Sequence, residues 1–447
     1  MKDEPSGEYY NWQKTGEPER PWLLPYHQTI VTKLLLARKQ IEDAPGNPRE
    51  VDGTHVYLTF EQALDVIRKL DNITLGMPRV IYLVGWQHRG HDSRYPDWSV
   101  VNPRLKRPED DTSAESLRWL IREAARYNAA VSLHINMFDA YEDSPLWQSY
   151  LAHNVIARDT DGNLIRGEVG GDVGVRPDTQ IHYISYAREW ELGFARKRID
   201  DLIEMVPELK DSKTIHIDAF HCYRPEGPEP RSVISPYLGY TPDEEAAAMR
   251  RIYRYWRDNG IDVTSEGSDF LRPDAFVGLQ PMSWWDEPQE IPNKLYCGSP
   301  MHAEEEIMAD PEVLSGLLDQ FCLQALPWFY RNNDDAKGIQ TMLVPDVGPK
   351  PQPRSGVFED VMTEYGNHVF MPALWREKTI VAYSRTGYKS RVWKLPSEWK
   401  DIEEVAISRI TLDGLVPVAR AMVSGGTLML SLKEREALSI SPSFSIA

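Results

Sequence analysis

Two short apolar runs near the middle of the chain each end on a carboxylate, and this pattern limits the fold more than any other feature. The first run, Thr214–Phe220 (TIHIDAF), carries Asp218 near its end, and the second, Ile261–Phe270 (IDVTSEGSDF), carries Glu266. Runs of this length and composition are typical of buried parallel strands. One helix-length block separates the two carboxylates, which are 266 − 218 = 48 residues apart. The sequence therefore predicts two consecutive strands of a β/α repeat.

In a parallel barrel the C-terminal ends of neighbouring strands lie on one face, and that face carries the chemistry. Asp218 and Glu266 are therefore expected to meet in one pocket. Two converging carboxylates are what glycoside hydrolysis requires, one as nucleophile or base and the other as proton donor.

The rest of the chain extends this repeat into an α/β protein. We expect residues 1–50 to be a covering segment with a helix at Gln28–Gln40, residues 51–374 to form a (β/α)8 TIM-type barrel, and residues 375–447 to form a C-terminal antiparallel β-sandwich. The predicted barrel strands are Thr54–Phe60, Arg79–Trp86, Ala129–Asn136, Thr214–Phe220, Ile261–Glu266, Ala275–Gln280, Lys294–Gly298 and Ile339–Val344.

Helix boundaries are marked by capping patterns. Thr59 with Gln62, Thr112 with Glu115, and Thr241 with Pro242 and Glu244 each predict a helix start, and Asn259-Gly260 predicts a helix end. A longer helix is expected over Tyr183–Met205.

Composition excludes several classes of protein. The net charge of −18 argues against a nucleic-acid partner, which would require clustered Lys and Arg. No stretch approaches the roughly 20 apolar residues of a membrane span. Three cysteines without close spacing predict neither a disulfide framework nor a zinc site. The N-terminal MKDEPSGEYYNW lacks the apolar segment of a secretion signal, which predicts a cytoplasmic protein as written, or a secreted or periplasmic one if a signal has been removed.

Polar side chains follow three other strand ends on the predicted catalytic face. Such a ring of donors and acceptors suits sugar hydroxyls. The chain has 14 Trp and 21 Tyr, and aromatic rings can stack on sugars. The candidate substrate contacts are Gln87, His88, His91, Asp92, His134, Asn136 and His221, with Trp98, Trp284 and Trp285 as stacking platforms.

Four segments resemble the catalytic barrel of glycoside hydrolase family 101, the endo-α-N-acetylgalactosaminidases. They are GWQHRGHDSRYPDW (Gly85–Trp98), SLHINMFDAYED (Ser132–Asp143), IHIDAF (Ile215–Phe220) and TSEGSD (Thr264–Asp269), and the G-H-D-S core is the most specific. The resemblance implies that Asp218 is the nucleophile and Glu266 the general acid/base, and that His91 and Asp92 contact the sugar. Gly267 stands where that family typically has an aromatic residue.

The expected activity is a retaining glycoside hydrolase that acts on a carbohydrate or glycopeptide. The resemblance favours an α-linked galacto-configured sugar, either an α-N-acetylgalactosaminide or an α-galactoside of an O-glycan. Asp218 would attack the anomeric carbon while Glu266 protonates the leaving oxygen. This mechanism requires neither a metal nor another cofactor, and the oligomeric state is left open.

Two other readings remain open at this stage. The first is a metal-dependent barrel hydrolase, a deacetylase or amidohydrolase, with His88, His91, Asp92, His134 and Asp218 as ligands. No His-x-His pair on one strand supports it. The second is a carbohydrate-binding protein without activity, which would be expected to lose one of the two carboxylates.

Overall fold

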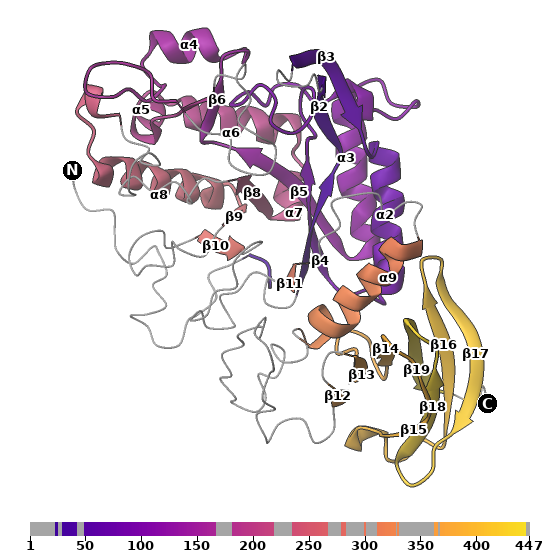
Figure 1. Ribbon diagram of the computed structural model, residues 1–447. Coiled ribbons are helices and arrows are strands. Elements are labelled where there is room, and N and C mark those ends of the chain that lie inside the picture. The colour runs from indigo at the N-terminus through magenta and orange to yellow at the C-terminus, as the bar shows by residue number, and fades with distance from the viewer. Residues whose placement is uncertain are drawn as a thin grey trace.

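The computed structural model describes residues 23–25, 29–42, 49–166, 181–218, 235–266, 279–282, 299–300, 311–327, 329, 362–364 and 367–443. Within these residues the central element is a seven-stranded sheet with the order β10-β9-β8-β5-β4-β1-β11 (Figure 1). Every pair of neighbours in it is parallel. The strands are β1 (Ile30–Leu35), β4 (Arg79–Val84), β5 (Ala129–Asn136), β8 (Thr214–Asp218), β9 (Asp262–Glu266), β10 (Leu279–Met282) and β11 (Ser299–Pro300).

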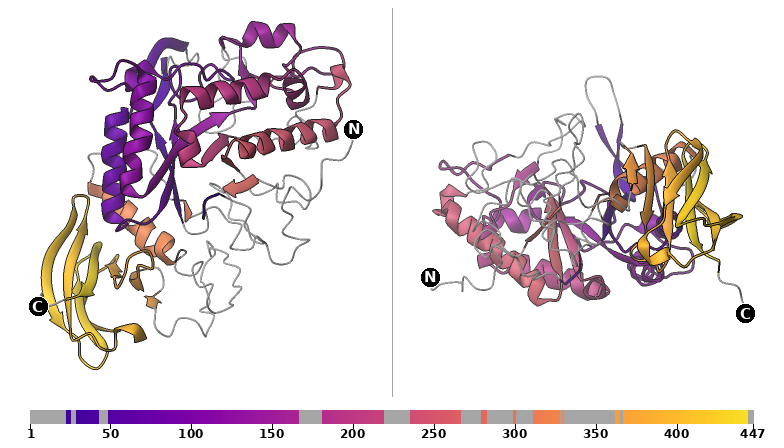
Figure 2. Two further views of the ribbon diagram at one scale, coloured as in Figure 1. Left: turned by 180° about the vertical axis from the view of Figure 1, so that it is seen from behind. Right: turned by 90° about the horizontal axis from the view of Figure 1, so that it is seen from below.

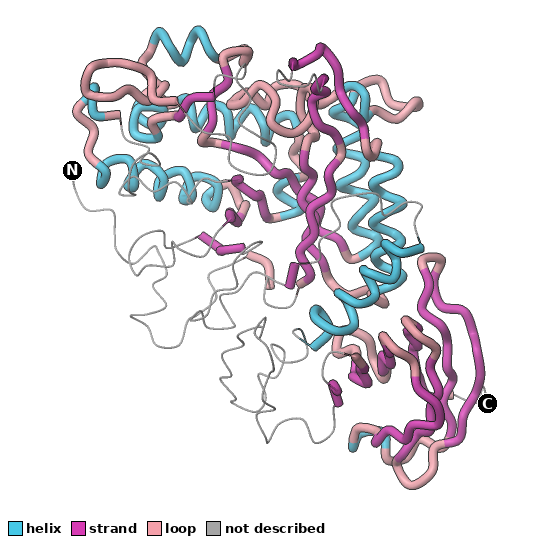
Figure 3. Tube along the Cα trace, in the orientation of Figure 1, coloured by secondary structure: helices cyan, strands magenta, loops and turns pink. Residues whose placement is uncertain are grey.

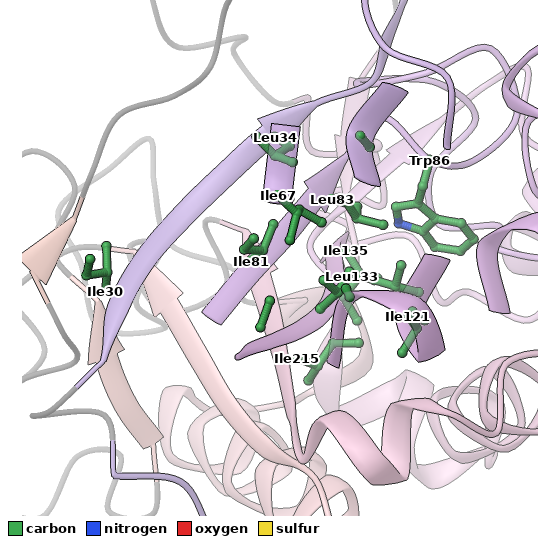
Figure 4. Close-up of a cluster of buried hydrophobic side chains, with 14 of the residues drawn as sticks. Ile30, Leu34, Ile67, Ile81, Leu83, Trp86, Ile121, Leu133, Ile135 and Ile215 are labelled. Carbon is green, nitrogen blue, oxygen red and sulfur yellow. The ribbon is translucent and has the colours of Figure 1, made fainter. Parts of the chain in front are cut away.

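Side chains alternate between two chemically different faces of this sheet. Ile81, Leu133 and Ile215 belong to the main hydrophobic core. It also contains Ile67 of helix α2 (Phe60–Ile73) and Ile121 of helix α3 (Ser113–Ala124) (Figure 4). The residues next to these on each strand point to the opposite face of the sheet, which we call the inner face. Its side chains are those of Tyr82, Ser132, His134, Asn136, Thr214, His216, Asp218 and Thr264. The strands are thus apolar toward the helices and largely polar on the other side.

Amphipathic helices cover the apolar face (Figure 3). The predicted capping boxes at Thr59, Thr112 and Thr241 are all confirmed. The α-helices joining or flanking these strands are α2 (Phe60–Ile73), α3 (Ser113–Ala124), α4 (Trp147–Ala152), α5 (Tyr186–Glu191), α6 (Phe194–Met205), α7 (Leu209–Ser212) and α8 (Pro242–Asp258), with single 3₁₀ turns at Pro103–Leu105, Ala125–Tyr127 and Pro236–Leu238.

The predicted single helix over Tyr183–Met205 is wrong. Ile181–Tyr183 is strand β7, which pairs with β6 (Asp139–Tyr141) in a small antiparallel sheet. The helical stretch that follows is broken between α5 and α6 at Gly193, whose φ of 78° is left-handed and ends the first helix.

The predicted helix at Gln28–Gln40 is also wrong. Ile30–Leu35 is six consecutive buried residues that pair in parallel with β4, so the segment assigned to a cover contributes a strand to the central sheet. β2 (Ala37–Glu42) and β3 (Arg49–Val56) then form an antiparallel hairpin, which projects from the molecule in Figure 2. The predicted first barrel strand, Thr54–Phe60, is therefore the end of that hairpin and the start of α2.

The later strand predictions are confirmed only in part. β10 overlaps the end of the predicted strand Ala275–Gln280, and β11 follows the predicted Lys294–Gly298. Residues 294–298 and 339–344 lie outside the described residues.

The C-terminal part is antiparallel, as predicted. A six-stranded sheet with the order β12-β13-β14-β19-β16-β17 and a two-stranded sheet, β15-β18, share one hydrophobic core that contains Phe370, Trp393 and Leu430. The strands are β12 (Met362–Glu364), β13 (His368–Pro372), β14 (Ile380–Ser384), β15 (Tyr388–Lys394), β16 (Glu404–Thr411), β17 (Gly414–Met422), β18 (Thr427–Leu432) and β19 (Glu436–Pro442), with a 3₁₀ turn at Ser397–Trp399. Because β12 and β13 belong to this sheet, it begins before the predicted boundary at residue 375.

Helix α9 (Pro311–Gln320) and the π-helical turn Phe321–Ala325 lie between the parallel sheet and the C-terminal sheets (Figure 1). Phe321 and Cys322 are buried in the same core as Val369 and Met371 of β13. Among the described residues no helix has both the length and the apolar composition to cross a membrane.

Glu245 of α8 gives the fold a pH-dependent stability. It is fully buried, and its carboxylate accepts hydrogen bonds from Ser185 Oγ (2.6 Å) and Ala187 N (2.8 Å) at the start of α5. Burial outweighs these bonds and raises the pKa of Glu245 to about 7. A raised pKa means that the folded state binds the proton more tightly than the unfolded state does. The stability contributed by the neutral acid is therefore lost as pH rises from 4.5, the ordinary pKa of a glutamic acid, to about 7.

We predict that the free energy of unfolding falls over this window by roughly 1 kcal/mol per pH unit more in the wild type than in Glu245→Gln, which cannot ionise. Urea unfolding of both proteins at a series of pH values measures the difference. Parallel pH profiles would show that Glu245 does not titrate in the folded protein.

Candidate active site

The candidate site lies at the C-terminal ends of β5, β8 and β9. Their registers place His134 opposite His216, and His216 opposite Thr264. Further along the same two strands, Asn136 pairs with Asp218. The last register pair of β8 and β9 is Ile217 with Ser265. The next positions on these strands are those of Asp218 and Glu266, so the backbone brings the two predicted catalytic residues to adjacent strand ends. Neighbouring strands are about 4.8 Å apart.

Asp218 is partly accessible and lies beside a buried histidine. Its side chain is 18% exposed, and its Oδ2 is 3.4 Å from Nε2 of His134, whose side chain is only 3% exposed. Proximity of an imidazole favours the ionised form of a carboxylate, because the ring can donate a hydrogen bond or carry a positive charge.

His216, two residues before Asp218, continues this group inward. Its ring centroid lies 5.2 Å from that of His134, and its Nδ1 is 3.0 Å from Thr264 Oγ1. The Thr264 hydroxyl in turn contacts Tyr82 OH at 2.9 Å, and Tyr82 OH lies 2.6 Å from Thr214 Oγ1. His216 was not among the site residues predicted from the sequence. It could have been found from its position two residues before Asp218, because residues two apart on a strand point to the same face of the sheet.

The loop after β4 reaches the site only because it contains glycine at two positions. A Cβ on Gly85 would lie 1.9 Å from the carbonyl oxygen of Ala37, and one on Gly90 would lie 2.5 Å from the same atom. Both glycines also have positive φ, 75° and 114°. This close approach lets His91 N donate to Ala37 O at 2.8 Å, which anchors the G-H-D-S segment on the start of β2.

His91 and Asp92 lie next to each other in this loop. The two side chains approach to 3.6 Å between His91 Nε2 and Asp92 Oδ2. The His91 ring packs edge-on against His134, with centroids 5.4 Å apart. His91 is thus linked through His134 to Asp218.

His88 and Gln87 have a different setting. His88 Nε2 lies 2.7 Å from Asp97 Oδ2, an atom that also accepts from Ser99 Oγ. Burial raises the pKa of Asp97, but the hydrogen bonds from His88 and Ser99 overcome this and keep it below its usual value. His88 therefore fixes the loop through Asp97. Gln87, 1% exposed, is buried at the base of the same loop.

Asn136 holds the turn between β5 and β6. Its Oδ1 accepts from the backbone N–H groups of Phe138 and Asp139, both at 2.8 Å, and its Nδ2 donates to Asp139 Oδ2 at 2.8 Å. With these three bonds and 1% exposure, Asn136 is engaged in structure rather than offered to a ligand as predicted.

Asp139 and Tyr95 were not predicted as site residues from the sequence, but the negative charges of the site raise the pKa of both side chains. Burial raises the pKa of Asp139 well above its usual range, and the negative charges of Asp92 and Asp218 raise it further. Burial and the same two charges raise the pKa of Tyr95. Asp92, Asp139 and Asp218 therefore share one electrostatic environment, in which Asp139 binds its proton more tightly than an aspartic acid in water does.

Four of the predicted substrate contacts do not belong to the described site. The prediction for Trp98 is wrong: it is 4% exposed, lies in the main core, and has the Arg198 guanidinium 4.3 Å from its ring centroid. His221, Trp284 and Trp285 lie outside the described residues, and of Glu266 only the backbone at the end of β9 is described.

Within the part of the chain that the structure describes, one group of residues could hold a metal ion. His134, His216 and Asp218 each offer a ligand atom, and these atoms lie within 4.8 Å of one another. Of the five ligands considered for a metal-dependent hydrolase, only His134 and Asp218 are in this group, and His88 is paired with Asp97 instead.

Residues 53–266 match the family model described as endo-α-N-acetylgalactosaminidase, glycoside hydrolase family 101. Among solved structures, α-N-acetylgalactosaminidase NagBb from Bifidobacterium bifidum is 16% identical over 57% of this chain and 37% of that chain, with a TM-score of 0.42. An α-amylase from Geobacillus thermoleovorans is 12% identical over 94% of this chain and 100% of that chain, with a TM-score of 0.42. An α-galactosidase, AgaA, from Geobacillus stearothermophilus is 12% identical over 94% of this chain and 57% of that chain, with a TM-score of 0.40. This chain thus spans less than half the length of the NagBb chain.

The electrostatics of Asp139 can be measured directly. We predict that the infrared carbonyl stretch of protonated Asp139, identified as the band that Asp139→Asn removes, persists to a higher pH than that of an ordinary aspartic acid, because burial and two neighbouring charges raise its pKa. In Asp218→Asn, where one of those charges is absent, the Asp139 band should disappear at a lower pH than in the wild type. A spectrum unchanged by Asp139→Asn would contradict the assignment.

Proposed function

We propose that this protein is a retaining glycoside hydrolase with Asp218 as nucleophile and Glu266 as general acid/base. The match of residues 53–266 to the family model described as endo-α-N-acetylgalactosaminidase supports this proposal. The substrate that we propose is an α-linked galacto-configured sugar, an α-N-acetylgalactosaminide or α-galactoside of an O-glycan or glycopeptide.

The observation that carries this proposal is the adjacency of two carboxylate positions at the ends of β8 and β9, with a histidine beside the first. Asp218 Oδ2 lies 3.4 Å from His134 Nε2, and the parallel register of the two strands brings position 266 level with position 218. Retaining enzymes hold their two carboxyl groups about 5 to 5.5 Å apart. Adjacent strands in register, about 4.8 Å apart, suit this separation better than the wider spacing of inverting enzymes.

The proposed reaction has two steps. Asp218, ionised beside His134, attacks the anomeric carbon while Glu266 donates its proton to the leaving oxygen. Water then hydrolyses the glycosyl ester with Glu266 as base, which regenerates both carboxyl groups. Asp218 suits the role of nucleophile because its side chain is 18% exposed and can be reached by a substrate, whereas the neighbouring His134 side chain is buried.

His91 and Asp92 are proposed to bind hydroxyl groups of the sugar. The loop that carries them is fixed by the backbone contact with Ala37 and by the two glycines that permit it. Donors and acceptors held this firmly reject an epimer strongly, because the wrong sugar leaves them unpaired.

We further infer that the parallel sheet closes as a (β/α)8 barrel. The neighbours follow chain order from β1 to β10, but β11, the last strand of this sheet in the chain, pairs with β1, its first. An open sheet built in chain order would leave these two strands at opposite edges, whereas a barrel makes them neighbours.

The choice of substrate follows from the matched family, whose description names an endo-α-N-acetylgalactosaminidase. The reading as an inactive carbohydrate-binding protein is less well supported, because both carboxylates are present in the sequence at the ends of adjacent strands.

We predict that the protein hydrolyses para-nitrophenyl α-N-acetylgalactosaminide or α-galactoside and that Asp218→Ala lowers kcat on the order of 10⁴-fold or more, because the first step loses its nucleophile. Azide should restore part of the activity to Asp218→Ala and give a glycosyl azide of inverted configuration. The matched control is Asp161→Ala, which removes an exposed carboxylate from a surface turn and should keep full activity. Near-full activity of a folded Asp218→Ala protein at saturating substrate would overturn the nucleophile assignment.

A further inference from the structure

We propose that His134, His216 and Asp218 form a binding site for a divalent transition-metal cation of the zinc type, and that a cation bound there inhibits the enzyme by occupying Asp218. The inhibition rests on the proposed function, since it requires Asp218 to be the nucleophile. The binding itself does not, because it depends only on the three side chains.

The distances suit a tetrahedral ion. Ligands bound to Zn²⁺ at about 2.0 to 2.2 Å are separated from one another by about 3.4 Å. Nε2 of His134 and Oδ2 of Asp218 already lie 3.4 Å apart, and all three ligand atoms lie within 4.8 Å of one another. Binding of the ion by all three ligand atoms therefore requires them to approach one another by about 1 Å, which movements of the side chains can provide without a change in the strands.

The hydrogen-bond chain behind His216 sets which of its nitrogens carries the proton. Tyr82 and Thr264 each have one hydroxyl proton. If Tyr82 donates to Thr214 and Thr264 donates to Tyr82, then Thr264 Oγ1 accepts from Nδ1–H of His216. Nε2 of the neutral ring is then the nitrogen with the lone pair. A histidine whose second nitrogen donates to a fixed acceptor is the usual arrangement of a metal ligand.

The backbone holds the site in place. His134 and His216 are direct register partners on β5 and β8, and Asp218 is the next residue on the same face as His216. The two histidines are 2% and 0% exposed, while Asp218 is the accessible member at 18%. A cation can thus enter from the Asp218 side, where the sugar is proposed to bind.

The donor set selects the type of cation. Two imidazoles and one carboxylate suit Zn²⁺ and related transition metals, whereas Ca²⁺ and Mg²⁺ require mainly oxygen ligands. A cation on Asp218 would engage the lone pair that must attack the anomeric carbon. Zinc is therefore expected to compete with substrate and to inhibit, rather than to serve the reaction.

The test uses the full chain after dialysis against a chelator. Binding is measured with Co²⁺, whose visible absorption reports tetrahedral ligation, and by displacement of Co²⁺ with Zn²⁺. Inhibition of aryl-glycoside hydrolysis is measured in parallel. We expect tetrahedral Co²⁺ bands, inhibition by Zn²⁺ that EDTA reverses, and no effect of Mg²⁺ or Ca²⁺ at the same concentration.

Three variants and a control test the ligands. His216→Gln and Asp218→Asn each remove one ligand and should abolish the tetrahedral Co²⁺ bands. Thr264→Val leaves the ligands but removes the acceptor for Nδ1–H, and should weaken Zn²⁺ binding by roughly 10- to 100-fold. His153→Gln changes a histidine on the surface after α4 and should bind Zn²⁺ as the wild type does. Asp218→Asn keeps the size and shape of the side chain, so it tests the site even if His216→Gln fails to fold.

Two results would overturn the proposal. The first concerns binding. The proposal fails if the wild type binds neither Co²⁺ nor Zn²⁺, and it also fails if Asp218→Asn and Thr264→Val bind them as the wild type does. The second is activation by Zn²⁺, which would make the cation part of the reaction. Failure of the proposed function is a separate result: a protein that binds Co²⁺ through these residues but hydrolyses no glycoside keeps the metal site and loses the glycosidase assignment.

Discussion

The alternation of side chains along strands buried on both faces is the constraint on which the rest of this structure depends. Outward residues such as Ile81, Leu133 and Ile215 pack in the core that the sheet shares with its helices. The residues between them must then be accommodated on the inner face, where Tyr82, His134 and His216 are almost fully buried. Polar groups buried without partners cost free energy. The hydroxyl chain from Thr214 through Tyr82 and Thr264 to His216 meets that requirement.

This inner network also prepares the site. It fixes His216 from behind, His216 lies against His134, and His134 lies against Asp218. Burial and the charges of Asp92 and Asp218 raise the pKa of Asp139, which opposes the gathering of three negative charges at the site. The partly exposed carboxylate of Asp218 is therefore positioned by a network of buried polar side chains. Such preorganisation is what a nucleophile needs, because no reorganisation is then required as charge moves in the reaction.

The sequence was sufficient where local chemistry decides the structure. The capping boxes at Thr59, Thr112 and Thr241 are confirmed, and the strands Ala129–Asn136, Thr214–Asp218 and Asp262–Glu266 lie within the predicted segments. Predictions failed where distant contacts decide: Ile30–Leu35 is a strand because β4 pairs with it, and Trp98 is a core residue because the Arg198 side chain covers its ring. His88 and Asn136 are polar residues at strand ends, as candidate ligands would be, but Asp97 and a turn engage them. No sequence pattern distinguishes these two roles.

The central claim is that carboxylates at adjacent strand ends perform a double displacement on an α-linked galacto-configured sugar. Proton NMR of the first product formed from an α-glycoside, recorded before mutarotation, tests it most directly. The account predicts an α-configured hemiacetal, and faster release from N-acetylgalactosaminide or galactoside than from the corresponding α-glucoside. A β-configured first product would contradict retention, and faster release from the α-glucoside would contradict the substrate assignment.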